Sequence, residues 1–306
     1  MGVRAFIFPG QGSQEVGMGR DLYEAYSSVR ALYARAGELL GFDLARLSFD
    51  GPAEELRQTR VTQPALFVHS TALQGLLRRR GVKPAMAAGH SLGEFTAFAA
   101  AGALSFAEGL RLVSSRAEAM TAAAALQPGA MAAIIGLDQA ALEKLCAQLS
   151  TGERVTVANI NSDQQLVVSG SKAGVDEVVK AASAAGARRA LPLPVSGAFH
   201  SPLMEPARQK LAHALAGAPF RAPRVPVYCN SDAQPVRNPD EIRRALERQL
   251  VSPVRWSEQV RRMIADGADE FIEIGAGSVL SGLVKRIDPA VRVRTVSSLQ
   301  DVLEFA

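Results

Sequence analysis

The sequence is poor in cysteine, in aromatic residues and in long apolar runs. It has two cysteines in 306 residues, Cys146 and Cys229, and aromatic residues make up 6% of it. Two isolated cysteines provide neither a disulfide framework nor the spacing of a metal site, so we expect no bound metal and a cytoplasmic protein with reduced thiols. No run of about 18 uninterrupted apolar residues occurs, so we expect no membrane-spanning helix.

The chain also lacks a strong excess of either charge. Lys and Arg number 34 against 30 Asp and Glu, which gives a formal net charge of +4. The densest basic run, Arg78-Arg79-Arg80, falls at the end of a predicted helix, where the helix dipole favours cations. No basic stripe is interleaved with aromatic residues. We therefore expect mild attraction to acidic partners and no binding of nucleic acid.

Apolar residues are plentiful, at 48%, and they recur as alternating strand and helix signals. The first strand, residues 3–8, leads into a glycine-containing loop. A dinucleotide-binding fingerprint would need glycine at position 15, where Glu15 stands, so that interpretation fails. The alternation predicts an α/β fold with a largely parallel sheet.

A different pattern occupies residues 128–196. We expect strands at 131–137, 154–160, 165–169 and 188–194, with helices at 138–149 and 172–185. This β-α-β-β-α-β order is that of a ferredoxin-like unit. Because the unit lies inside the chain, the larger domain must be discontinuous and consist of residues 1–127 and 197–306. A cleft between the two units is the natural place for a ligand.

The most informative motif is Gly89-His90-Ser91-Leu92-Gly93, between a predicted buried strand at 82–88 and a predicted helix at 94–101. A serine at such a nucleophile elbow has its hydroxyl exposed on a sharp turn, and the helix N-terminus offers N–H groups to a developing oxyanion. We interpret Ser91 as a nucleophile on a hydrolase-like core. The alternative is a tightly packed turn of small residues without chemistry.

A nucleophilic serine needs a base, and the chain has four histidines. We expect His69 to be packed in a buried helix, His213 to be solvated, and His90 to point away from the neighbouring serine. His200 lies in a small-residue loop where the chain leaves the inserted unit, which places it at the cleft. We therefore predict His200 as the general base, although the spacing reveals no acidic third member.

Arg116 is unusual because its helix neighbours are apolar. A capping box, Ser105 to Glu108, predicts the start of this helix. The residues three and four positions from Arg116 are Leu112, Val113, Ala119 and Met120. A buried guanidinium without a partner is costly, so either a protein carboxylate or a bound anion must neutralise it. A ligand carboxylate would match its fork at two points.

With these residues identified, the chain strongly resembles the malonyl-CoA:acyl carrier protein transacylases. The expected ferredoxin-like unit is one point of similarity, and Phe95, where Tyr is frequent, is one difference. The matching motifs extend over the whole chain: Phe8-Pro9-Gly10-Gln11-Gly12-Ser13-Gln14 with Gly17-Met18-Gly19, Thr62-Gln63-Pro64-Ala65, Gly89-His90-Ser91-Leu92-Gly93-Glu94, Arg116, and Gly197-Ala198-Phe199-His200-Ser201-Pro202-Leu203-Met204.

The resemblance implies a catalytic role for five positions. Ser91 would attack the malonyl thioester with His200 as its base. The backbone carbonyl of Gln249 would orient the histidine in place of an acid. The backbone N–H groups of Gln11 and Leu92 would form the oxyanion hole.

The resemblance also implies the substrates. Arg116 would hold the malonyl carboxylate, Gln63 would line the pocket, and Phe199 stands where malonyl-selective members carry Phe. The reaction would transfer malonyl from malonyl-CoA to an acidic acyl carrier protein in fatty acid biosynthesis. It would need no cofactor, because the substrates carry the phosphopantetheine.

Other interpretations stay open at this point. A stand-alone acyltransferase that loads a polyketide synthase carrier protein would share these motifs. A serine thioesterase or esterase would share the elbow, although neutral esters do not need an inward-facing Arg116. A non-enzymatic scaffold would leave Ser91 and His200 without a purpose.

Overall fold

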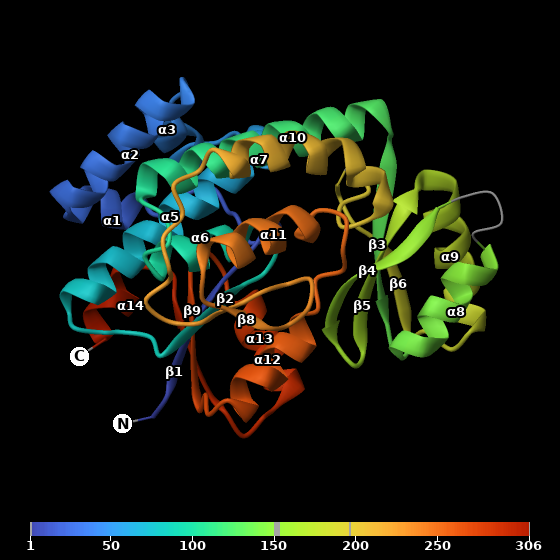
Figure 1. The fold of residues 1–306 in the computed structure, drawn as a ribbon. Helices are drawn as coiled ribbons and strands as arrows, with labels where there is room; N and C mark the ends of the chain where they lie inside the picture. The colour runs from blue at the N-terminus through green and yellow to red at the C-terminus, as the bar shows by residue number, and fades with distance from the viewer. Residues whose placement is uncertain (1, 150–153, 196, 306) are drawn as a thin grey trace.

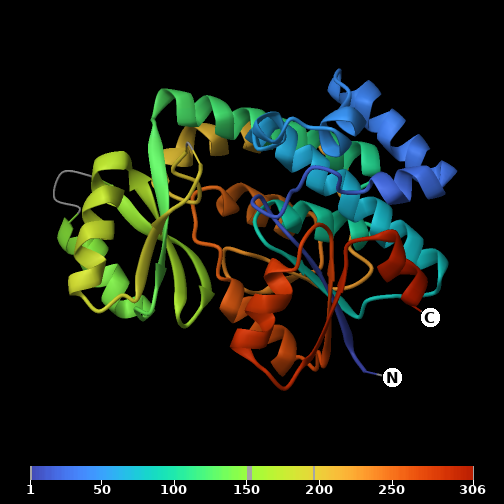
Figure 2. The same ribbon diagram turned by 180° about the vertical axis from the view of Figure 1, so that it is seen from behind.

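The computed structural model describes residues 2–149, 154–195 and 197–305, whose strands form two separate sheets (Figure 1; Figure 2). One sheet has six strands in the order β10-β9-β1-β2-β7-β8, and the other has four in the order β4-β5-β3-β6. Residues 1, 196 and 306, which bound the segments expected for the two units, lie outside the described residues. We keep 128–196 as the proposed extent of the inserted unit.

The six-stranded sheet is the largely parallel sheet that the sequence predicts. Its strands are β1 (Arg4–Phe8), β2 (Met86–Gly89), β7 (Val227–Tyr228), β8 (Pro235–Val236), β9 (Glu270–Ile274) and β10 (Arg292–Val296). Only the pairing of β7 with β8 is antiparallel. The strand expected at 82–88 is shorter than predicted and shifted: Pro84 lacks an N–H group for the ladder, and β2 begins two residues beyond it.

Helices cover both faces of this sheet (Figure 1). One face carries α5 (Thr59–Arg79), α6 (Leu92–Ala100), α7 (Phe106–Leu126), α10 (Glu205–Ala216) and α11 (Pro239–Gln249), and the other carries α12 (Trp256–Ala265) and α13 (Val279–Ile287). Alternate residues of β1 serve the two cores. Phe6 and Phe8 pack toward α5 and α6, whereas Ala5 and Ile7 pack toward α12 and α13. The remaining helical segments are α1 (Arg20–Ala25), α2 (Ser27–Leu40), α3 (Leu44–Phe49), α4 (Ala53–Leu56), α14 (Leu299–Glu304) and the short 3₁₀ turn Pro202–Met204.

The four-stranded sheet confirms the β-α-β-β-α-β order. It is antiparallel throughout, and its elements are β3 (Gly129–Ile135), α8 (Gln139–Leu149), β4 (Val155–Ser162), β5 (Gln165–Ser171), α9 (Lys172–Ala184) and β6 (Arg189–Pro192). Both helices pack on one face around a separate apolar core that includes Ile134, Leu166 and Val168. The expected element ends differ from the observed ones by at most two residues, as is usual for frayed ends.

The smaller sheet is attached to the larger unit along β4. Val254, just before α12, exchanges backbone hydrogen bonds with this strand: its N–H donates to Ala158 O and its carbonyl accepts from Ile160 N, at 2.8 and 2.9 Å. Arg261 on α12 pairs with Asp163 in the β4–β5 turn at 2.7 Å. In the described part of the chain, no helix is long and apolar enough to cross a membrane.

The corner between β2 and α6 is packed so closely that two positions accept only glycine. A Cβ atom at Gly89 would lie 1.9 Å from the carbonyl group of Gly93, and one at Gly93 would lie 2.0 Å from Phe8 O. Between them, Ser91 has a φ of 52°, which is rare outside glycine. Such strain costs about 1–3 kcal/mol and is typical of functional positions.

We predict that Gly89→Ala lowers the free energy of unfolding by at least about 1–3 kcal/mol, because backbone atoms must move to admit the methyl group. Gly282→Ala is the matched control: in α13 nothing lies within 4 Å of the added Cβ. That change should be neutral or stabilise the helix by up to about 1 kcal/mol. Urea unfolding of both variants tests this, and equal losses would contradict the packing argument.

Candidate active site

The elbow serine and the predicted base meet at the site. Ser91 Oγ lies 2.7 Å from His200 Nε2, and His200 Nδ1 lies 2.9 Å from the backbone carbonyl of Gln249. Because a carbonyl can only accept, Nδ1 carries the proton and Nε2 is free to accept from the serine hydroxyl. The arrangement has the geometry of a nucleophile, a base and an orienting acceptor.

The surroundings of His200 keep its imidazole neutral. Burial lowers its pKa from 6.5 to about 3, and the positive charge of Arg116 acts in the same direction, while the hydrogen bond to Gln249 opposes them. A neutral imidazole is the form that accepts a proton. The base is therefore ready at neutral pH without an acidic partner.

Arg116 on α7 points into the site and is fully buried. Its Nη1 donates to Gln63 Oε1 at 2.8 Å, and its Nη2 donates to Ser91 Oγ and to Gln249 Oε1, both at 3.0 Å. Among the described residues no carboxylate forms an ion pair with it, and Nε has no hydrogen-bond partner. Burial lowers its pKa to about 10, and the negative charge of Glu94 opposes this shift. The partners of this cation are thus neutral groups.

Glu94 and Asn230 complete the network, and sequence reasoning did not assign them a role. Glu94 is fully buried, and its Oε2 accepts from Asn230 N at 2.9 Å and from Gln249 Nε2 at 3.0 Å. Burial raises its pKa to about 7. Arg116 was predicted to face the interior because it is a charged residue among apolar helix neighbours. Glu94 has the same kind of neighbours in α6, so the same reasoning could have predicted that it is buried.

Asn230 fixes the backbone of the nucleophile. Its Oδ1 accepts from Ser91 N at 2.8 Å, and its Nδ2 donates to Gly89 O at 2.7 Å and to Gln259 Oε1 at 3.1 Å. Gln249 Nε2 reaches Ser91 O at 2.8 Å from the other side. The strained turn is therefore held by side-chain amides from distant segments.

Gln11 and Leu92 each lie three residues beyond the end of a strand, Gln11 after β1 and Leu92 after β2, where it begins α6. Their backbone N–H groups have no acceptor among the residues that the structure describes, whereas the Gln11 side chain donates from Nε2 to Thr59 Oγ1 at 3.3 Å. The register brings the strand ends together, because Phe8 pairs with Gly89. Two free donors beside the nucleophile are what an oxyanion requires.

The other histidines lie apart from the reacting atoms. His90 Nε2 lies 2.9 Å from Asn161 Oδ1 on β4, which ties the elbow to the smaller sheet. His69 is buried in α5, and burial lowers its pKa to about 4. His213 is exposed near the end of α10.

Phe199 is buried beside the base and lines a pocket of about 490 Å³. The pocket is also lined by Thr59, the partner of Gln11, and by the small residues Ala124 and Ala125 of α7. This pocket adjoins the site from the side of α5 and α7. Its size is within the range of small-molecule sites.

An elbow serine, a neutral histidine and free N–H donors on an α/β core are the features of enzymes that carry an acyl group on serine. The family model for the acyl transferase domain matches residues 5–299. The malonyl CoA-acyl carrier protein transacylase of Escherichia coli K12 is 48% identical over 298 residues, which cover 97% of this chain and 96% of that protein. The chain belongs to the malonyl CoA-acyl carrier protein transacylase family.

Solved structures of proteins with related names have the same fold as this chain. An acyl carrier protein S-malonyltransferase from Vibrio cholerae has a TM-score of 0.95 and 44% identity, and the match covers 99% of this chain and 100% of that one. A malonyl-transacylase in complex with a type II PKS acyl-carrier protein has a TM-score of 0.96 and 42% identity, with 99% and 98% covered. The two-unit fold is therefore shared by this family.

The low pKa of His200 predicts the pH dependence of serine reactivity. Labelling of Ser91 by a neutral fluorophosphonate should stay fast well below pH 6.5 and fall only as the pH approaches the lowered pKa of about 3, where the base becomes protonated. Arg116→Gln removes a positive charge, so the pKa should rise and the decline should move to higher pH. A wild-type decline centred near pH 6.5 that Arg116→Gln leaves unmoved would contradict this electrostatic picture.

Proposed function

We propose that this chain transfers a malonyl group from malonyl-CoA to the phosphopantetheine thiol of an acyl carrier protein through a malonyl-Ser91 ester. One observation supports this most: the buried Arg116 guanidinium touches the nucleophilic oxygen and has only neutral partners. An acyl group on Ser91 with a carboxylate at its far end would bring an anion to this cation. A two-point contact with that carboxylate would give the site its selectivity.

The proposed reaction has two similar halves. His200 Nε2 takes the Ser91 proton as Oγ attacks the thioester carbonyl, and the N–H groups of Gln11 and Leu92 stabilise the oxyanion. Collapse breaks the C–S bond, and His200 returns the proton to the departing coenzyme A thiolate. The carrier thiol then gives its proton to His200 and attacks the ester. The C–O bond to Ser91 breaks as the malonyl thioester forms, and His200 returns the proton to Ser91 Oγ.

Fatty acid biosynthesis is the proposed pathway, with a cytoplasmic location and no cofactor. The relative in complex with a type II PKS acyl-carrier protein supports the second candidate, a transacylase that loads a polyketide synthase carrier. Both candidates use the same chemistry. A thioesterase would instead hydrolyse malonyl-CoA steadily when no carrier protein is present.

Mass spectrometry of the intact protein tests the function. With malonyl-CoA, the wild type and His213→Ala, a histidine variant outside the site, should gain one malonyl group and lose it to added holo-carrier protein. Ser91→Ala should gain none, because the nucleophile is absent. Malonyl label on Ser91→Ala, or turnover to free malonate without carrier, would refute the proposal.

The pocket beside Phe199 predicts acyl-chain selectivity. Phe199→Ser should raise the ratio of methylmalonyl-CoA to malonyl-CoA use, because the ring is replaced by space for a 2-methyl group. The shift should be modest, since one methyl group in an apolar pocket is worth roughly 1–3 kcal/mol. Competing acylation of the protein by both thioesters measures the ratio, and an unchanged ratio would place Phe199 outside the acyl pocket.

We further propose that an acidic carrier protein docks by charge at a basic cleft between the two units. Arg188 and Arg189 from the smaller unit and Arg286 on α13 line a cleft of about 430 Å³. Arg286 Nη1 bonds Gln165 Oε1 at 2.7 Å, on the hairpin whose Asn161 contacts His90 beside the nucleophile. The cleft therefore lies on an element that reaches the site.

Docking of this kind predicts a salt-dependent KM for the carrier protein. The KM should rise with salt, because the Debye length is about 10 Å at 0.1 M ionic strength. Arg286→Glu should raise it at low salt and weaken its salt dependence, whereas Arg244→Glu, an exposed position on α11, should do neither. Steady-state kinetics at several salt concentrations measure this, and a KM that is independent of salt would count against steering.

A further inference from the structure

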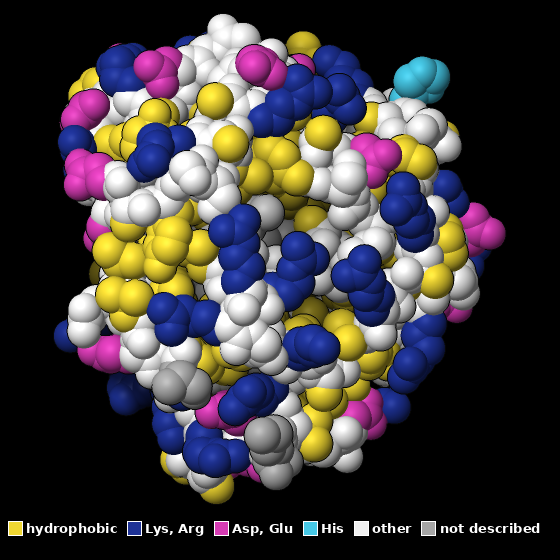
Figure 3. Space-filling view, turned by 90° about the vertical axis from the view of Figure 1, so that its left-hand side faces the viewer, with side chains coloured by type: hydrophobic (Ala, Val, Ile, Leu, Met, Phe, Trp, Pro, Cys, Tyr) yellow, Lys and Arg dark blue, Asp and Glu magenta, His cyan; other side chains and the backbone are white. Residues whose placement is uncertain are grey.

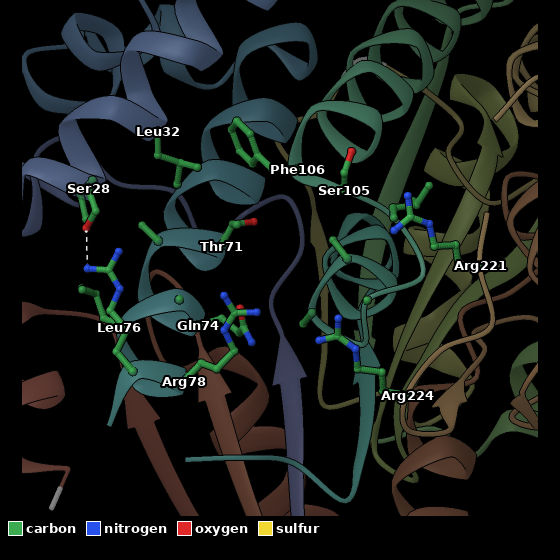
Figure 4. A pocket seen from close by; sticks show the side chains of 18 residues that line it. Ser28, Leu32, Thr71, Gln74, Leu76, Arg78, Ser105, Phe106, Arg221 and Arg224 are labelled. Atoms are coloured by element: carbon green, nitrogen blue, oxygen red, sulfur yellow. Dashed lines mark hydrogen bonds between the residues drawn. The ribbon is translucent and has the colours of Figure 1, made fainter. Parts of the chain in front are cut away.

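A second basic pocket lies at the far end of the helices that carry the active site. It has a volume of about 390 Å³ and is lined by the last turns of α5, the end of α6, the start of α7 and the loop after α10 (Figure 4). Ser91 adjoins the opposite end of α6, nine residues and about 13 Å away along the helix. None of the proposed catalytic or substrate-binding residues lines this pocket.

Four arginines surround the pocket: Arg78, Arg79, Arg221 and Arg224. Within the described residues, none of them forms an ion pair with Asp or Glu; Arg79 donates to Ser28 Oγ at 3.1 Å. In Figure 4 the guanidinium groups of Arg78 and Arg224 face one another across the opening. Figure 3 views this side of the molecule, where Lys and Arg side chains gather around a hollow. Several cations around one opening, without carboxylates paired to them in the described structure, favour an anion between them.

The fold holds two of these arginines in place. Arg221 N donates to Ala103 O at 2.9 Å and Arg224 N donates to Ala101 O at 2.8 Å, so the loop is fixed to the turn between α6 and α7. A Cβ atom at Gly102 would lie 3.1 Å from Arg224 Nε, so the guanidinium group rests on that turn. The dipole of α5 accounts for basic residues at its own end, but it does not account for those of this loop.

In the described structure one acidic group interacts with these arginines, and its carboxylate already has hydrogen-bond partners of its own. Glu108 interacts with Arg221, but its carboxylate accepts from Ser105 N at 2.9 Å in the capping box that starts α7. Apart from the amide of Gln74, the rest of the pocket is apolar or carries hydroxyl groups, with Leu32 and Phe106 at one end (Figure 4). The pocket thus combines a cationic end with an apolar end.

We propose that this pocket binds a small molecule that carries a phosphate or diphosphate group on an apolar or aromatic body. Arginine forks match phosphate oxygens at two points, and Phe106 and Leu32 offer a surface to the body. The concave shape and the volume suit a small ligand, whereas an acidic protein would meet only the rim. The site is separate from the acyl-transfer site and does not depend on the function proposed for it.

Isothermal titration calorimetry at constant ionic strength, in chloride buffer, tests the proposal with ADP and with pyrophosphate. The wild type should bind ADP more tightly than pyrophosphate, because only ADP has a body for the apolar end. Arg78→Ala and Arg224→Ala should each weaken binding of both probes at least tenfold. Arg244→Ala, which removes the same charge elsewhere, should leave both affinities unchanged.

ADP is also part of coenzyme A, so the two arginine variants decide where ADP binds. ADP held at the site around Ser91 would bind Arg78→Ala and Arg224→Ala as it binds the wild type, because neither arginine belongs to that site. The proposal is overturned if ADP does not bind at millimolar concentration or if the two arginine variants bind as the wild type does. The four side chains lie at the surface, and unchanged melting temperatures would show that the variants are folded. Malonyl transfer, measured separately, tests the other site.

Discussion

The site depends on one buried positive charge that no carboxylate in the described part of the chain neutralises by an ion pair. Arg116 is fully buried and is held by Gln63, Gln249 and the nucleophile Ser91 through neutral oxygens. Burying an unpaired cation is costly, and its lowered pKa reflects that cost. The rest of the site compensates by supplying amide oxygens at fixed positions. An anion that enters the site gains the interaction that the protein leaves unfilled.

Gln249 couples this charge to the catalytic pair. Its side-chain Oε1 faces Arg116, its Nε2 donates to Ser91 O and to Glu94, and its backbone carbonyl accepts from His200. A guanidinium can only donate and a backbone carbonyl can only accept, so Arg116 and Ser91 O together fix which way the amide of Gln249 points. One residue thus sets the positions of the nucleophile, the base and the cation. This explains why the base needs no acid: a carbonyl orients it, and burial together with the nearby cation keeps it neutral.

Much of the fold and the reacting pair could be predicted, because their signals are local. The elbow motif indicates Ser91, loop position indicates His200, and an apolar helix face indicates Arg116. A backbone carbonyl such as that of Gln249 leaves no trace in residue type, so only family resemblance pointed to it. Asn230 accepts from a backbone N–H 139 positions away in the chain. An asparagine after a short strand is common, so its position in the sequence does not indicate a role in the site. The predicted strand at 82–88 is longer than β2, because the run of apolar residues suggested a strand that continues through Pro84, where no N–H group is available for pairing.

The most direct test of the account is the acyl selectivity of Arg116→Ala. Malonyl brings a carboxylate to the guanidinium, and acetyl brings none. The variant should lose malonyl-CoA kcat/KM by an amount equivalent to about 2–5 kcal/mol, while acetyl-CoA use holds or rises. Arg116→Lys should restore malonyl use only in part, since it supplies charge without the planar fork. Equal losses for malonyl-CoA and acetyl-CoA would show that Arg116 supports the structure alone, and would contradict the account.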